Sequence, residues 1–136
     1  MTVVDASVVV ELVASESGWR REAALATLPP AERPWSAPEL VHFEVFSAIR
    51  RLTRRGHLEP ALAETALERV YDIPLETTPT AALIPAAWLL RDRCSTGDAF
   101  YAALAQRRDE PLLTTDRGLG RAATAVGVEA LTLGEE

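Results

Sequence analysis

Hydrophobic positions along the chain fall into two patterns, short continuous runs and longer segments with helical spacing. The short runs are bounded by turn-forming or charged residues and are rich in valine, leucine and threonine, which is typical of buried strands. Strands are therefore predicted at residues 3–5, 35–37, 75–77, 112–115 and 129–133.

Between these runs, apolar residues recur every three to four positions, as in helices that pack on a core. Pro38 suits the first position of the third helix and Gly56 its C-cap. Helices are predicted at residues 6–14, 18–28, 38–56, 60–71, 79–92, 97–108 and 119–126. Strands that alternate with helices indicate an α/β fold with a parallel sheet covered by helices. Since no linker or repeat interrupts this order, a single domain over residues 1–136 is predicted.

The composition indicates an ordinary globular protein, with 48% hydrophobic and 25% charged residues. No run approaches the roughly 18 apolar residues that indicate a membrane helix. The start of the chain lacks the basic region and cleavage site of a signal peptide. Cys94 is the single cysteine, which excludes an internal disulfide and fits a reducing compartment. We therefore expect a cytoplasmic protein with no membrane contact.

Four acids carry the chemical interest of the chain: Asp5, Glu44, Asp98 and Asp116. Three of them lie where a strand or loop passes into a helix, and Glu44 lies within a helix. The C-terminal ends of parallel strands meet at one edge of the sheet, where such folds bind ligands. Carboxylates gathered there repel one another unless a divalent cation lies between them, and Mg²⁺ or Mn²⁺ suits their oxygen atoms. The pattern predicts a metal-dependent hydrolase.

Each acid also has a simpler interpretation. Asp5, Asp98 and Asp116 could cap or favour the N-terminus of the following helix, and Glu44 could be a solvated helix residue. The neighbours of Glu44 argue against the last interpretation, because they predict a helix that is mostly buried, where a lone carboxylate is costly. These apolar neighbours are Val41, Phe43, Val45, Phe46 and Ile49.

Two arginines follow Glu44 on the same predicted helix. Arg51 and Arg55 lie seven and eleven residues later, close to whole numbers of turns and about 10 and 16 Å along the axis. They would extend a basic track from the metal site that suits a phosphate backbone. The alternative is a solvated basic helix end that favours the helix dipole.

Several other chemistries are excluded. The chain has no P-loop, no GxSxG elbow and no HExxH motif, and its GxG at Gly118 and Gly120 lacks a third glycine. All fourteen basic residues are arginine. The absence of lysine argues against response-regulator receivers and haloacid-dehalogenase phosphatases, which also place acids at strand ends. The net charge of −6 argues against nucleic acid at first, but four of the acids would be offset by bound metal.

The segments VVDASV, PELVHFEVFSAIRR, STGDAFYAALA and LLTTDRGL resemble, in this order and over essentially the whole chain, the PIN-domain family and its small VapC-type toxins. The resemblance implies a three-layer sandwich with a central five-stranded parallel sheet and an Mg²⁺- or Mn²⁺-dependent endoribonuclease. It assigns the metal-site acids to Asp5, Glu44, Asp98 and Asp116. Ser7 and Thr114 match the hydroxyl residues beside the first and last acids, as supports of the site.

The resemblance also implies partners. The substrate would be RNA, cut by metal-activated water to leave 5′-phosphate ends, and a cognate antitoxin would block the site. The family pattern and an apolar helix pair suggest a homodimer with a groove for the antitoxin. A non-cleaving PIN-fold module that binds RNA or protein remains the alternative. The helix pair is taken from Phe43, Phe46, Leu58 and Leu67.

Overall fold

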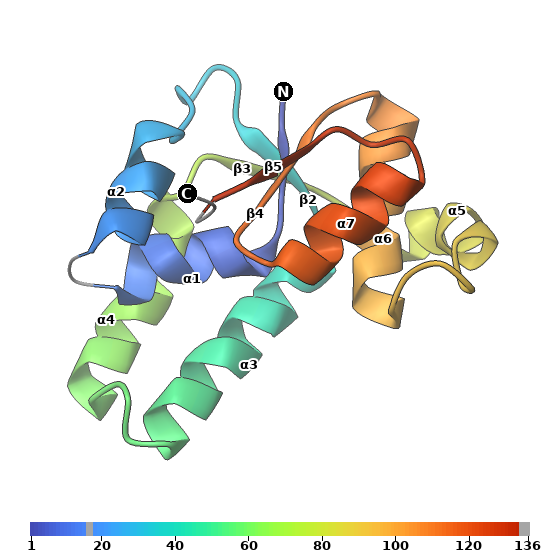
Figure 1. Cartoon of the computed structure of the whole chain (residues 1–136). Coiled ribbons are helices and arrows are strands. Elements are labelled where there is room, and N and C mark those ends of the chain that lie inside the picture. Colours follow the sequence, from blue (N-terminus) through green and yellow to red (C-terminus); the bar gives the residue numbers. More distant parts are fainter. Residues whose placement is uncertain (16–17, 134–136) are drawn as a thin grey trace.

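A parallel sheet of five strands forms the centre of the molecule in a computed structural model that describes residues 1–15 and 18–133. The order of the strands is β3-β2-β1-β4-β5, and every neighbouring pair is parallel. The first strand of the chain therefore lies in the middle of the sheet (Figure 1). The strands are β1 (Val3–Val4), β2 (Trp35–Pro38), β3 (Leu75–Thr78), β4 (Leu112–Thr114) and β5 (Ala130–Thr132).

Helices cover both faces of this sheet. Alternate strand residues enter different cores, because successive side chains of a strand point to opposite faces. Val4 packs with α1 to α4, whereas Val3 packs with α6 and α7. The expected three-layer sandwich is thereby confirmed. The helices are α1 (Ala6–Ala14), α2 (Trp19–Ala26), α3 (Leu40–Arg54), α4 (Pro60–Arg69), α5 (Ile84–Leu89), α6 (Thr96–Arg108) and α7 (Arg117–Ala125), with 3₁₀ turns at Val70–Asp72 and Thr80–Leu83.

Two helix boundaries differ from the sequence prediction because of proline. Pro38 does not begin a helix; it is the buried last residue of β2, paired with Thr78 of β3. The predicted helix at residues 79–92 is divided into a 3₁₀ turn and the short α5. Pro85 lies at the start of α5, where its missing N–H costs nothing. Gly56 follows α3 with φ of 74°, a conformation that glycine adopts without strain.

Helix α3 is amphipathic, so the expectation that it is mostly buried is wrong. Its core contacts come from one stripe, Val41, Val45 and Ile49, spaced four residues apart. Phe43 and Phe46 are 73% and 55% exposed. These two apolar residues lie beside the buried stripe and face solvent, so their presence in the sequence did not indicate a buried helix.

The expected apolar helix pair is also corrected. Leu58 is buried in the core and is not part of an exposed surface. The half-buried Leu67 lines a hollow together with Phe46, as expected, whereas Phe43 lines a different cleft. Within the described part of the chain, no helix is long and apolar enough to cross a membrane.

Candidate metal-binding site

The fold brings all four predicted acids to one cleft of about 680 Å³. Asp5 follows β1 and Asp116 follows β4, two neighbouring parallel strands that end at the same edge. Glu44 comes from the second turn of α3 and Asp98 from the first turn of α6. The sheet topology thus unites residues more than a hundred positions apart in sequence.

Asp5 is the most buried of the four, with 6% of its surface exposed. Both of its carboxylate oxygens accept hydrogen bonds from hydroxyl groups. Ser7 Oγ donates to Oδ1 at 2.6 Å and Thr114 Oγ1 donates to Oδ2 at 2.9 Å. Asp5 makes no side-chain cap hydrogen bond to α1. Its carboxylate is therefore oriented by the two hydroxyls, which are the two residues that the sequence placed beside the acids.

The same two hydroxyls also fix the loop that carries Asp116. Thr114 Oγ1 accepts from the backbone N–H of Asp116 at 2.9 Å, and Ser7 Oγ accepts from Thr115 N–H at 3.0 Å. Each hydroxyl donates to Asp5 while it accepts from the β4–α7 loop. The relative position of Asp5 and Asp116 is therefore set by two side chains.

The helix-cap interpretation holds for Asp116 and fails for Asp98. Asp116 Oδ1 accepts from the N–H groups of Gly118 and Leu119, so it caps α7. Asp98 is no cap: Ser95 caps α6 and accepts from the N–H of Asp98 at 3.4 Å. The Asp98 carboxylate is therefore not held by the backbone of its own helix.

Glu44 is tied to α6 by a residue that the sequence analysis missed. The hydroxyl of Tyr101 donates to Glu44 Oε1 at 2.5 Å. Tyr101 is 2% exposed and follows Asp98 by almost one helical turn, the signal that could have identified it. On the other side, a Cβ atom at Gly97 would lie 3.2 Å from Glu44 Oε2. The Glu44 carboxylate is thus seated against the first turns of α6.

Burial and the charges of neighbouring carboxylates disfavour the charged forms of Asp5, Glu44 and Asp98. Burial, with a smaller contribution from the Asp116 charge, raises the pKa of Asp5 to about 6 against the hydrogen bonds from Ser7 and Thr114. Burial and Asp116 also raise the pKa of Asp98, and burial and Asp98 raise that of Glu44. The four carboxylates therefore form one electrostatically coupled group that a cation would relieve.

The four carboxylates are not arranged as a preformed metal-binding site. Across residues 1–15 and 18–133, no three His, Cys, Asp or Glu side chains lie close enough together to hold a metal ion as they stand. Electrostatic repulsion between the carboxylates favours their separation when no cation is bound. Mg²⁺ usually retains several waters and contacts one or two carboxylates directly. The open set of hard oxygen ligands therefore fits a hydrated cation.

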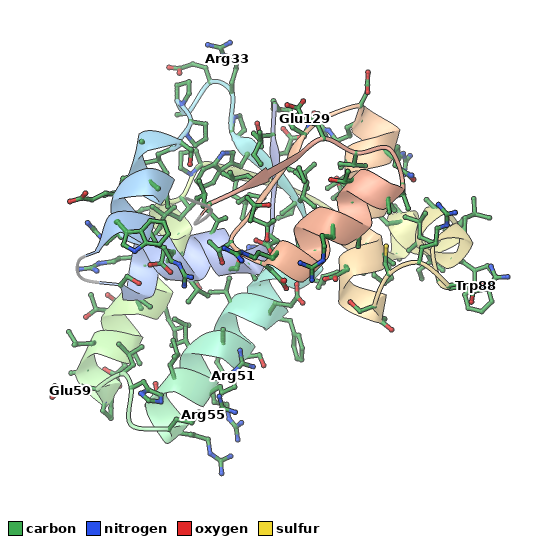
Figure 2. The ribbon with its side chains drawn as sticks, viewed as in Figure 1. Arg33, Arg51, Arg55, Glu59, Trp88 and Glu129 are labelled. Atoms are coloured by element: carbon green, nitrogen blue, oxygen red, sulfur yellow. The ribbon has the colours of Figure 1, made fainter. Side chains whose placement is uncertain are left out.

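The two predicted RNA-binding arginines differ in position. Arg51 lines the acid cleft, whereas Arg55 ends α3 beyond it. Figure 2 shows both side chains projecting from the lower part of α3 into solvent. Arg20, in the first turn of α2, lines the cleft as well. The arginines that line the cleft are therefore Arg51 of α3 and Arg20 of α2, and not the predicted pair from α3 alone.

Comparison with known proteins gives the chain its family. The family model described as "PIN domain" matches residues 2–125 of this chain. A relative named Ribonuclease VapC3, from Mycobacterium tuberculosis, is 39% identical over 120 residues, which cover 88% of this chain and 85% of that protein.

Two solved structures share the fold at lower identity. FitAcB from Neisseria gonorrhoeae superimposes with a TM-score of 0.65, at 18% identity over 100% of each chain. VapC20 of Mycobacterium tuberculosis, described as a sarcin-ricin loop cleaving toxin, gives a TM-score of 0.63 at 20% identity over 94% of this chain and 96% of its own. With a family match over most of its length and a relative above 30% identity, the chain belongs to the PIN-domain family and is similar to VapC ribonucleases.

Proposed function

We propose that this chain is an Mg²⁺- or Mn²⁺-dependent endoribonuclease that acts as the toxin of a toxin–antitoxin pair. The observation that carries the proposal is the single cleft lined by Asp5, Glu44, Asp98 and Asp116, in a chain 39% identical to a protein named a VapC ribonuclease. One domain over residues 1–136 would carry the activity, in the cytoplasm where RNA is available.

The carboxylates would hold the cation, with Asp5, Asp98 and Asp116 as its closest ligands. The coupling of their charges and the all-oxygen donor set support this assignment. When bound, such a cation supplies an acidified water and stabilises charge on the phosphate. Glu44 would orient water or hold a second ion.

The remaining side chains explain why the metal would be needed. Neither histidine of the chain lines the cleft: His42 faces a different hollow and His57 lies beyond α3. The Tyr101 hydroxyl is unsuited as a base, because burial and the Glu44 carboxylate raise its pKa far above the usual value. Its proton stays on the oxygen and holds Glu44 in place. The protein therefore contributes positioned carboxylates rather than a histidine, lysine or tyrosine base.

The direct test is incubation of the purified chain with RNA in Mg²⁺, in Mn²⁺ and in EDTA. We expect cleavage products with 5′-phosphate ends in either metal and none in EDTA. RNA that is bound but uncut under every metal condition would favour the non-cleaving PIN-fold module. Cleavage that persists in EDTA would contradict metal dependence.

Tyr101→Phe should lower cleavage by about 10- to 100-fold, a typical effect of losing a group that orients a metal ligand. The ring still fills the core between α6 and the sheet, so the melting temperature should change little. Weaker Mn²⁺ binding in calorimetry, with an unchanged KM, would locate the loss at the metal site. Tyr71→Phe is the matched control, because Tyr71 is 90% exposed. Equal Mn²⁺ affinity for wild type and Tyr101→Phe would remove Tyr101 from the site.

We also propose a homodimer and a cognate antitoxin partner. Phe46 lines an apolar hollow with Val70, Tyr71 and Ile73, between α3 and the segment leading into β3. An exposed hollow of this kind suits burial by another protein surface. Light scattering on dilution should show a dimer, and Phe46→Asp should weaken it by at least about tenfold. The control Trp88→Asp changes an exposed aromatic on α5. A monomer at every concentration would reject the dimer.

A further inference from the structure

The acid cleft extends well beyond the four carboxylates. One wall is formed by α1 and the start of α2, and the other by α3. Val10 and Arg20 line the first wall, and Phe43 and Arg51 line the second. The carboxylates therefore occupy one part of a longer channel, whose remaining surface includes two arginines and one exposed phenylalanine.

Phe43 is the least expected side chain in this channel. It directly precedes Glu44 on α3, and 73% of its surface is exposed. Phe46, three residues later, faces the separate hollow with Val70 and Tyr71. The two exposed phenylalanines of one helix thus serve different surfaces, and only Phe43 lies beside the acids.

The arginines of the channel come from both walls. The guanidinium of Arg20 lies 5.5 Å from the centre of the Trp19 ring, a cation–π contact that limits its freedom. Arg51 projects from α3 two turns beyond Glu44 (Figure 2). Guanidinium groups on two walls suit a polyanionic strand that passes between them.

We infer that this channel binds an unpaired RNA segment, with one base stacked on Phe43 and backbone phosphates bound by Arg20 and Arg51. The inference deepens the proposed ribonuclease function and rests on it. Stacking on an exposed aromatic ring needs a base whose face is free, which a duplex does not offer. Asp5, with 6% exposure, lies deep in the cleft, where a single flexible strand reaches more readily than a helix.

The charge of the channel sets the condition for binding. Five acids line it, the four of the site and Glu11, against two arginines. Without metal this surface repels a phosphate backbone, so divalent cation and RNA should bind cooperatively. Asp98→Asn, which removes one of these charges, should therefore raise the affinity for RNA in EDTA.

The test measures binding of a hydrolysis-resistant phosphorothioate RNA of about twelve nucleotides, within the range that single-strand sites occupy. It is compared with the same strand annealed to its complement, in Mn²⁺ and in EDTA. Phe43→Ala should weaken binding of the unpaired strand by about tenfold, and Phe43→Tyr should restore it. Trp88→Ala, the matched control at an exposed aromatic of α5 outside the channel, should bind as wild type does.

Salt dependence tests the arginines separately. Arg20→Ala and Arg51→Ala should each flatten the dependence of log affinity on log salt by roughly 0.7. Arg54→Ala, an exposed arginine of the same helix outside the channel, should leave the slope unchanged. Equal slopes for all these proteins would overturn the role of the arginines.

Two further results would overturn the inference. One is equal affinity for the unpaired strand and the duplex. The other is a Phe43→Ala variant that binds RNA normally but dissociates in light scattering, which would assign Phe43 to a protein contact. If this Phe43→Ala variant still cleaves RNA, the channel inference fails while the ribonuclease proposal holds. Wild-type protein that binds RNA as described but never cleaves it would reject the ribonuclease proposal alone.

Discussion

Asp98→Asn should lower RNA cleavage by at least about a hundredfold, the upper end of what supporting residues of a metal site contribute. Asparagine has nearly the same shape and lacks the charge that a cation would bind. The fold should be unaffected, because Ser95 rather than Asp98 caps α6. Loss of a half-buried carboxylate whose pKa is raised by burial and Asp116 should leave the metal-free melting temperature equal or higher.

The matched control for this substitution is Asp92→Asn. Asp92 lies on the surface just before α6, and its 3.9 Å ion pair with Arg91 is of a type that contributes little stability. The Asp92→Asn variant should cleave RNA as wild type does, and should arrest growth on expression to the same extent. Near-wild-type cleavage by a folded Asp98→Asn protein would exclude Asp98 as a metal ligand.

Asp5→Asn should stabilise the metal-free protein at neutral pH by about 3 kcal/mol, the free energy of a pKa difference of about two units. The pKa of Asp5 is raised from 3.8 to about 6 in the folded state. Folded wild type therefore holds a proton that the unfolded chain has lost, and this stabilisation is complete below about 3.8 and lost as the pH rises through 6. Above pH 6 the wild type has a buried charge, whereas asparagine is neutral.

Denaturation of both proteins in EDTA at pH values from about 4 to 8 measures this difference. The advantage of Asp5→Asn should be present at pH 7 and disappear towards pH 4. The hydroxyls of Ser7 and Thr114 can reorient toward an amide, since each has a second lone pair. An advantage that is constant over this range would show that repacking, and not the charge of Asp5, is responsible.

Added metal should first offset the stability advantage of Asp5→Asn and then reverse it at about a thousandfold excess over the dissociation constant, where binding stabilises wild type by about 4.1 kcal/mol. A cation that binds only the folded state stabilises wild type by about 2.7 kcal/mol at a hundredfold excess over its dissociation constant. Asp5→Asn has lost a ligand and should gain much less. Equal metal-induced shifts in melting temperature for the two proteins would exclude Asp5 as a metal ligand.

The sequence by itself determined the class of fold and the identity of the acids. Apolar runs that alternate with helical segments can bury both faces only in a parallel sheet covered by helices. Asp5 and Asp116 follow such runs directly, so their place at the C-terminal edge was predictable from local order. The hydroxyl contacts of Ser7 and Thr114 with Asp5 agree with the positions that the family resemblance gave them.

Only the tertiary structure decided what these acids contact and which side chains share their cleft. Tyr101 meets Glu44 because α3 and α6 pack beside the same edge of the sheet, although the two residues are 57 positions apart. In the sequence, Phe43 and Phe46 are equivalent, since both are phenylalanines of one predicted helix. The elements that pack around α3 place Phe43 in the acid cleft and Phe46 in the hollow that Tyr71 lines. Periodicity fixes which face of a helix is apolar, but the partner of that face, and hence its exposure, depends on how distant elements pack.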